Sequence, residues 1–498
     1  MSARPGPRLR HALGWNPREA GAGERELQRV LDKGPFAPTW SSLQKYQMPA
    51  WFRDAKFGIF IHWGVYSVPA FANEWYSRNM YQPGSREFLH HRATYGDQTK
   101  FGYKDFIPRF TASQFEPKKW ADLFRRAGAR YIVPVGEHHE GFQMYESALS
   151  SWNALEMGPH RDVLGELNAA FTDAGLIFGT SSHRAEHFWF MDGGRLFDSD
   201  VQDPDFADFY GPAQPGPKEH FDRDESPPTA EFVEDWQRRT QELIDAYRPR
   251  SLYFDWWIQH RKFEQKLREI AAYYYNRAAE WGTEVVINYK LEGFAKGAAV
   301  FGVERGQLAG IQAEPWQTDT SISKSSWCYV EDQEYKTARE LICDLIDIVS
   351  KNGSMLLNVG PRADGLIAPQ EEQVLLDMGA WLAQNGAAIY GSRPFRTFGE
   401  GPTQAIEGQF SEGKRSGYVP GDYRFTRKGD EIYAFALSPP EDGRLSITSL
   451  GTRASPEAIS SVELLGAGPV AFQRDAEALH VELGAVAVRA LPAVLKIQ

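Results

Sequence analysis

The sequence predicts an α/β fold, a (β/α)8 TIM-like barrel followed by a C-terminal β-sandwich. Between about residues 51 and 393, short apolar runs rich in β-branched and aromatic residues alternate with amphipathic helical segments, which favours a parallel sheet covered by helices. Beyond Pro394 the helical period disappears and short alternating segments follow. A doubly wound open sheet is the competing architecture, but no G-x-G-x-x-G follows the first run.

Three parts of the chain differ in composition. Residues 1–50 are rich in Pro, Gly and Arg and are expected to be a lead-in segment with one helix near Glu24–Lys33. Residues 51–393 carry the catalytic barrel. Its expected strands are the apolar runs Phe57–Trp63, Tyr131–Val135, Leu176–Thr180, Leu252–Trp257, Val285–Tyr289, Ala298–Val303 and Met355–Val359.

Helices are expected where apolar residues recur with the 3.6-residue period. The clearest are Asp162–Ala174, Glu231–Tyr247 and Tyr335–Lys351. Residues 192–228 interrupt this rhythm with many prolines and aspartates. An insertion of this kind after a barrel strand lies on the face that carries active sites, and it is expected to wall the site there.

Residues 394–498 are expected to form the β-sandwich. Asp422–Thr426 and Ile432–Leu437 flank a Lys-Gly-Asp turn and indicate a hairpin. Leu479–Leu483 and Val486–Ala490 alternate with period two, as strands with one buried face do. We find no candidate catalytic residue in this part of the chain.

Composition excludes several functions. Lys and Arg number 55 against 66 Asp and Glu, a formal net charge of −11 that argues against nucleic acid as a partner. No apolar stretch is long enough to span a membrane, and no apolar segment of a signal peptide follows the basic N-terminus, so a cytoplasmic protein is expected. Two cysteines do not make a disulfide framework. A homo-oligomer stays open.

Polar residues gather at the ends of the expected strands, where a parallel barrel places its functional side chains. They are His62, Trp63, His138, His139, His183, Asp255, Lys290 and Glu304. Any one of these residues could have a structural role. Polar or aromatic residues at the ends of several strands together, however, indicate a functional site. Because 13% of the residues are aromatic and many stand beside His or Asp, as Trp63, Trp75 and Phe142 do, the pattern suits a sugar.

Asp255 is the sharpest single signal. A carboxylate between Phe254 and Trp256 in a buried strand costs several kcal/mol unless the site needs it. A retaining glycosidase needs such a nucleophile and a second carboxyl group about 5–5.5 Å away that acts as acid and then as base. Glu304, directly after a strand, is the favoured acid/base, and Glu314 and Asp319 are the alternatives.

A metal site is the competing interpretation. His62, His183 and the segment Glu137–Glu140 could supply nitrogen and oxygen ligands for zinc. Adjacent histidines on an extended chain point to opposite sides, however, so His138 and His139 are not expected to chelate one ion. We therefore expect neither a metal nor another cofactor.

Several blocks resemble the α-L-fucosidases of glycoside hydrolase family 29. These blocks are Phe57–Tyr76 (FGIFIHWGVYSVPAFANEWY), Glu137–Phe142, Leu252–Asp255, Thr320–Tyr329, Asn352–Asp364 and Trp381–Pro394. Their order and number, spread over Trp51 to Pro394, make the match specific.

The resemblance implies a retaining exo-hydrolase that removes terminal α-L-fucose from oligosaccharides or glycoconjugates without a metal. It makes Asp255 the nucleophile and Glu304 the acid/base. The residues that would hold the fucose hydroxyls and flank its ring are His62, Glu74, Trp75, His138 and His139. Trp327 would lie near the methyl group on C5.

The chain departs from this family pattern at three places. Trp256 and Cys328 stand where glycine is usual, and Ser181–His187 replaces a segment with Tyr and Glu-Trp, so His183 or His187 would take over an aromatic contact. Three other functions therefore stay open. They are a related glycosidase for another sugar such as a D-galactoside, a non-catalytic carbohydrate-binding protein, and a metal-dependent hydrolase.

Overall fold

A closed eight-stranded parallel barrel forms the larger part of the molecule, as predicted. The computed structural model describes residues 21–404, 406–414, 416–483 and 491–498. The barrel strands, in order around it, are β1 (Phe57–Ile61), β2 (Tyr131–Glu137), β3 (Ile177–Ser182), β4 (Ser251–Phe254), β5 (Val286–Lys290), β6 (Val300–Glu304), β7 (Trp316–Ser321) and β8 (Gly353–Val359). β8 pairs with β1 and closes the barrel, which rules out the open sheet.

The seven predicted strands are confirmed, and β7 was missed. Its sequence, Trp-Gln-Thr-Asp-Thr-Ser, has no apolar run, although all six residues are buried. Polar partners explain this burial. Tyr131 of β2 donates a hydrogen bond to Gln317 inside the barrel, and Lys290 of β5 contacts Asp319.

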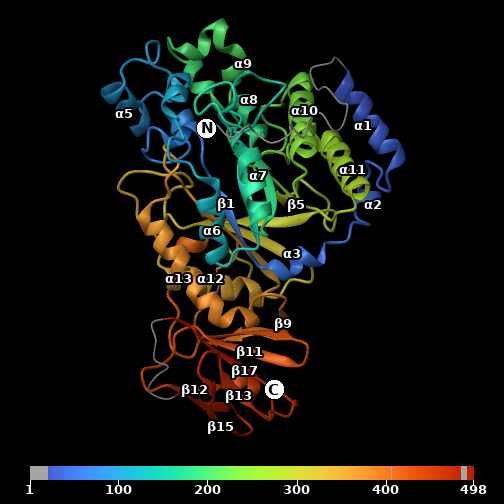
Figure 1. Cartoon of the computed structure of the whole chain (residues 1–498), viewed down its shortest axis with the longest axis vertical. Coiled ribbons are helices and arrows are strands. Elements are labelled where there is room, and N and C mark those ends of the chain that lie inside the picture. The colour runs from blue at the N-terminus through green and yellow to red at the C-terminus, as the bar shows by residue number, and fades with distance from the viewer. Residues whose placement is uncertain (1–20, 405, 415, 484–490) are drawn as a thin grey trace, which may run out of the picture.

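Helices cover the outside of the barrel (Figure 1). The longer ones are α6 (Pro117–Arg126), α7 (Val163–Asp173), α10 (Ala230–Tyr247), α11 (Glu264–Trp281), α12 (Ala338–Ser350) and α13 (Pro369–Asn385). The three predicted helices correspond to α7, α10 and α12. The connections 291–299 and 305–315, between β5, β6 and β7, contain no helix, so the alternation is incomplete there.

Short helices extend the loops and the N-terminal part. They are α2 (Trp40–Leu43), α3 (Ala50–Ala55), α4 (Tyr76–Asn79), α5 (Arg86–Thr94), α8 (His187–Phe190) and α9 (Ala207–Tyr210). α1 (Ala22–Lys33) spans the helix predicted in the lead-in segment and packs against α11, where Arg29 pairs with Glu280. No helix in the described part of the chain is long and apolar enough to cross a membrane.

Two antiparallel sheets form the C-terminal domain, below the barrel in Figure 1. One has the order β14-β13-β17-β11-β10-β9 and the other β12-β16-β15. The strands are β9 (Arg393–Glu400), β10 (Tyr423–Lys428), β11 (Glu431–Ala436), β12 (Arg444–Ile447), β13 (Val462–Leu464), β14 (Gly468–Pro469), β15 (Ala471–Arg474), β16 (Leu479–Glu482) and β17 (Ala493–Ile497). Phe425 and Leu495 of the first sheet share a core with Leu445 and Val481 of the second, so the domain is the predicted sandwich.

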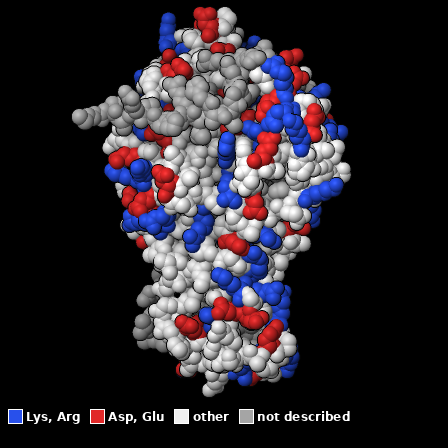
Figure 2. Space-filling model, turned by 45° about the vertical axis from the view of Figure 1, so that its right-hand side comes forward, with Lys and Arg blue, Asp and Glu red and all other residues white. Residues whose placement is uncertain are grey.

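The hairpin β10–β11 and strand β16 are confirmed, whereas the strand expected at Val486–Ala490 lies outside the described residues. Buried charges connect the sandwich to the barrel. Arg424 of β10 and Lys351 both pair with Asp347 of α12, and all three side chains are almost fully buried. Such a network is costly to break, so it holds the two domains in one arrangement. Positive and negative side chains are interspersed over the face seen in Figure 2.

Candidate active site

One cavity of about 390 Å³ opens at the carboxyl ends of the barrel strands, within the size range of small-molecule sites. All eight site residues predicted from the sequence line it. They are Asp255, Glu304, His62, Glu74, Trp75, His138, His139 and Trp327. The structure adds further lining residues, namely Phe60, Asn73, His183, His220, Phe221, Tyr253, Trp256, Asp319 and Phe410.

His62, directly after β1, is fixed by Asn358 of β8. The amide of Asn358 donates to the carbonyl of Trp327 at 2.6 Å, so its oxygen faces His62 and accepts from the ring Nδ1 at 2.7 Å. This arrangement leaves Nε2 of His62 as a hydrogen-bond acceptor.

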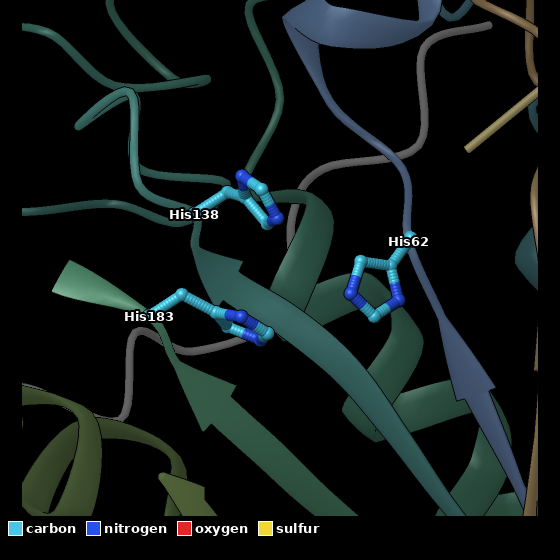
Figure 3. A group of neighbouring side chains, drawn as sticks. All are labelled: His62, His138 and His183. Atoms are coloured by element: carbon cyan, nitrogen blue, oxygen red, sulfur yellow. The ribbon is translucent and has the colours of Figure 1, made fainter. Parts of the chain in front are cut away.

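His62, His138 and His183 lie at the ends of β1, β2 and β3 and turn their rings toward one another (Figure 3). Their ring centroids are 5.0–5.7 Å apart. Because burial lowers the pKa of each ring, all three are neutral imidazoles at neutral pH. A neutral imidazole offers one donor and one acceptor, which suits the hydroxyl groups of an uncharged sugar.

The same rings also have ligand geometry for a metal ion. His62, His138 and His183 form one group whose ligand atoms lie within 4.8 Å of one another, and His139, His183 and Asp255 form another. In the second group, however, His183 already contacts Asp255 through Nδ1 and Ser181 through Nε2, both at 2.9 Å. The prediction of a metal-free site therefore stays a prediction.

The expected orientation of His138 and His139 is wrong. His138 and His139 do not point to opposite sides, because they follow β2 instead of lying in it, and their ring centroids are only 4.3 Å apart. Their contacts still differ. His139 donates from Nδ1 to the carbonyl of His183 at 2.9 Å, whereas Nδ1 of His138 has no hydrogen-bond partner among the described residues.

Glu74 and Trp327 close another side of the cavity. Glu74 is almost fully buried, and its carboxylate accepts from the backbone N–H of Trp327 at 2.9 Å. Burial raises the pKa of Glu74. The Trp327 ring lies beside His62 and Phe60, with centroids 5.1 and 6.2 Å away, and so gives this side an apolar wall.

Asp255 follows β4 and accepts a hydrogen bond from Nδ1 of His183 at 2.9 Å, and Nε2 of His139 lies 3.4 Å from the same oxygen. Burial works to raise the pKa of Asp255. The interactions with His183, His139 and Lys290 outweigh burial and hold it well below its usual range. Asp255 is therefore an ionised and almost fully buried carboxylate that lines the cavity.

Lys290, at the end of β5, joins two more carboxyl groups. Its Nζ lies 2.8 and 2.9 Å from the two oxygens of Asp319 and 3.1 Å from Glu304. Burial alone would lower the pKa of Lys290, but these carboxylates and Asp255 raise it. Burial, together with the charge of Glu304, raises the pKa of Asp319 to about 7. The indole N–H of Trp256 donates to the same Glu304 oxygen.

Three lining residues were not singled out from the sequence. His220 and Phe221 belong to the insertion at 192–228, which walls the cavity as predicted. Burial would lower the pKa of His220, but Glu186, 3.0 Å away, raises it. Phe410 belongs to the C-terminal part, where no site residue was expected. Its backbone N–H donates to the carbonyl of Glu304 at 2.8 Å. No local signal in the sequence marks this contact.

Some expected neighbours lie elsewhere. Trp63 packs into the core against Phe110, Phe115 and Trp120, and neither it nor Phe142 lines the cavity. Glu314 is exposed and precedes β7, which places it at the amino end of that strand.

The departures from the family pattern fall on both sides of the cavity wall. His183 and Trp256 reach the cavity and contact Asp255 and Glu304. His187 and Cys328 do not line the cavity: His187 donates to the carbonyl of His139, and Cys328 is buried against Tyr66 and Val330.

Known proteins resemble this chain over most of its length. The family model "Alpha-L-fucosidase" matches residues 25–387, and the model "Alpha-L-fucosidase C-terminal domain" matches residues 418–498. Human tissue α-L-fucosidase is 31% identical over 442 residues, covering 86% of this chain and 84% of the relative. Human plasma α-L-fucosidase is 33% identical over 448 residues, covering 87% and 85%. The structure of Thermotoga maritima α-fucosidase in complex with fucose has a TM-score of 0.72 at 27% identity, covering 93% of this chain and all of that one.

Proposed function

The chain belongs to the α-L-fucosidase family, and we propose that it removes terminal α-L-fucose by a double displacement with Asp255 as nucleophile and Glu304 as acid/base. The observation that carries this proposal is the ionised carboxylate of Asp255. It is held by His183 and His139, in a cavity that Glu304 also lines. The substrate class is fucosylated oligosaccharides and glycoconjugates.

In the first step, a carboxylate oxygen of Asp255 attacks the anomeric carbon while the carboxyl group of Glu304 gives its proton to the leaving oxygen. The bond to the leaving group breaks, and a fucosyl ester of Asp255 forms. In the second step, Glu304 takes a proton from water, whose oxygen attacks the anomeric carbon and displaces the carboxylate of Asp255, so that the ester bond breaks. Fucose leaves with the α configuration retained, and both carboxyl groups return to their first state.

The other lining residues support the fucose ring. The neutral rings of His62 and His138 and the Nε2 atom of His139 offer hydrogen bonds to its hydroxyls, and Glu74 offers an acceptor. Trp327 and Phe60 give an apolar surface for the methyl group on C5. A D-galactoside would place a hydroxymethyl group against this surface, which is why we favour fucose over that alternative.

Asp319 is the second candidate for the acid/base, because its pKa is raised to about 7 by burial. Both of its oxygens contact Lys290, however, and its side chain is 1% exposed against 9% for Glu304. We therefore assign Asp319 to holding Lys290 beside Glu304.

The test is nitrophenol release from p-nitrophenyl α-L-fucoside with EDTA in the buffer. We expect the wild type to release nitrophenol, and Asp255→Gly to lose at least about 10⁴-fold in kcat. Azide should restore part of the rate of this variant and give β-fucosyl azide, since azide then attacks from the side of the missing carboxylate. Wild-type rates from Asp255→Gly would contradict the assignment, and loss of wild-type activity with EDTA would favour a metal.

A further inference from the structure

Three aromatic rings gather at the mouth of the cavity, on the side of Glu304. Phe221 and Phe410 are 47% and 45% exposed and are the only exposed phenylalanines among the described residues, yet both line the cavity together with Trp256. Exposed phenylalanines scattered singly over a surface need no explanation. Two that line the same cavity do need one. We name Phe221, Trp256 and Phe410 the aromatic rim.

The rings of the aromatic rim contact one another. Trp256 lies between the other two, with its ring centroid 4.8 Å from that of Phe221 and 5.9 Å from that of Phe410. The planes of Trp256 and Phe410 differ by only 20°, so they are close to parallel. The rim is therefore an apolar surface on which the rings of Phe221 and Phe410 are exposed to solvent and the ring of Trp256 is buried.

The chain holds Phe410 in this position. Gly408 donates to the carbonyl of Gln307 at 2.9 Å, and Glu412 pairs with Arg305 and Lys336 at 2.9 and 2.8 Å. Phe410 itself has φ 54°, in the left-handed region, where a residue with a side chain costs about 1 kcal/mol. The anchored segment overcomes this cost and brings a ring from the C-terminal part of the chain to the barrel mouth.

The position of the aromatic rim decides what can occupy it. The indole N–H of Trp256 donates to Glu304, and the N–H of Phe410 donates to the carbonyl of the same residue. The leaving oxygen must lie beside Glu304, which protonates it, while the fucose ring lies toward Asp255. The atoms bonded to the far side of the leaving oxygen must therefore lie over the rim.

We propose that the aromatic rim is a leaving-group subsite for a ring with a flat apolar face bonded directly to the scissile oxygen. An aryl group and the C–H face of a pyranose both present such a face. This inference rests on the proposed function of Glu304. The phenylalanines carry no polar atom, and the N–H of Trp256 is already used, so the rim contacts a ring face and not a pattern of hydroxyls.

The test compares three inhibitors by calorimetry. The first is an iminocyclitol of fucose configuration, which fills only the fucose part of the cavity. The second carries a phenyl group where the leaving group would be, and a third carries a glucopyranosyl group there. The readout is the Kd of the unextended inhibitor divided by the Kd of an extended inhibitor. A loss of affinity that a variant causes for both inhibitors cancels in this ratio.

In the wild type we expect a ratio on the order of 10 for the phenyl extension, from the ring area that the rim covers. Phe221→Ala and Phe410→Ala should each lower the ratio by about threefold, and the double variant should bring it close to 1. Leu196→Ala and Ile406→Ala are matched controls, since both residues are exposed, lie in the same two segments and do not line the cavity. They should leave the ratio unchanged.

The outcomes separate this inference from the function on which it rests. If the unextended inhibitor does not bind, the proposed function fails. If it binds but phenyl and glucopyranosyl extensions both gain less than about twofold, or if the gain survives in the double variant, the subsite is overturned. A gain from both extensions identifies the apolar ring face as what is recognised, and a gain from phenyl alone restricts the occupant to aryl groups.

Discussion

Strands β1 to β3 bring histidines to the cavity, whereas strands β4 to β7 bring carboxyl groups and a lysine. In the histidine half, burial lowers the pKa values of His62, His138 and His183, so these rings are neutral. In the charged half, Asp255, Glu304 and Asp319 surround the buried Lys290. The two halves of the cavity therefore suit different tasks. In the function proposed here, neutral donors and acceptors would hold an uncharged sugar, and the charges would lie where a bond breaks.

The largest effect should follow from removing the acid/base in the charged half. Glu304→Ala should lower kcat by about 10²- to 10⁴-fold for a fucoside with a sugar leaving group, and less for the nitrophenyl fucoside, which needs no protonation to leave. Azide should restore turnover and give α-fucosyl azide, because Asp255 remains the nucleophile. Steady-state kinetics and product analysis check this.

Asp319→Asn is the comparison variant for this prediction. If Glu304 keeps its role, Asp319→Asn should leave the relative rates of the two fucosides as in the wild type. If azide rescues Asp319→Asn and not Glu304→Ala, the acid/base is Asp319, and our division of the charged half is wrong.

The next largest effect should follow from removing Lys290, whose positive charge lies among the carboxyl groups of the charged half. Lys290→Met leaves the carboxyl groups of Asp319 and Glu304 facing each other without a cation, which should lower the free energy of unfolding by about 3–5 kcal/mol at pH 8. The loss should be smaller at pH 5, because Asp319, whose pKa burial already raises to about 7, is then protonated. Urea unfolding at the two pH values measures it.

Lys324→Met provides the matched control. Lys324 is 47% exposed and pairs with Glu334, which is 80% exposed, so the loss should stay below about 1 kcal/mol at either pH. If Lys290→Met lowered the free energy of unfolding by no more than Lys324→Met does, water would screen the charges around Lys290 as it screens those on the surface.

The sequence predicted much of this structure, and its failures have physical reasons. The barrel followed from strands that read as continuous apolar runs, because helices cover them outside and side chains fill them inside. β7 was missed because Gln317 and Asp319 face polar partners inside the barrel, so its sequence does not read as a buried strand. His62, His138, His139, Asp255 and Glu304 were expected at the cavity because strand ends converge in any parallel barrel, whereas Glu74, Trp75 and Trp327 came from the resemblance to the family. Phe410 was not found, because only the folded chain brings it to Glu304.

In the histidine half the effects should be smaller and should fall on binding. His62→Ala and His138→Ala should each lower kcat/KM by about 10- to 100-fold, mainly through KM, because each removes hydrogen bonds to hydroxyl groups that are present before and during the reaction. His90→Ala is the control, since this ring stacks on Phe71 outside the cavity.

The pH dependence sharpens the same prediction. Because burial holds the pKa values of His62 and His138 well below their usual range, neither ring gains a proton near pH 6.5. The fold loss of each variant relative to the wild type should therefore stay constant between pH 6 and 8. A loss that disappears toward pH 6 would show that the wild-type ring charges there, and the histidine half would not be neutral.

The smallest effect tests Glu140, a carboxyl group beside His138. Glu140 is buried, with one oxygen 3.6 Å from Nδ1 of His138, and burial raises its pKa to about 8. Between its usual pKa of 4.5 and about 8, the folded state binds more protons than the unfolded state, so the stability of the wild type should fall as pH rises. Glu140→Gln removes this dependence, and its stability relative to the wild type should rise by about 1 kcal/mol between pH 6 and 7. Urea unfolding measures the slope.

Glu371→Gln should show a similar slope, since burial also raises the pKa of Glu371 to about 8, whereas exposed Glu116→Gln should show none. If Glu140→Gln shows no slope while Glu371→Gln does, Glu140 is ionised at neutral pH, and the histidine half carries a charge of its own.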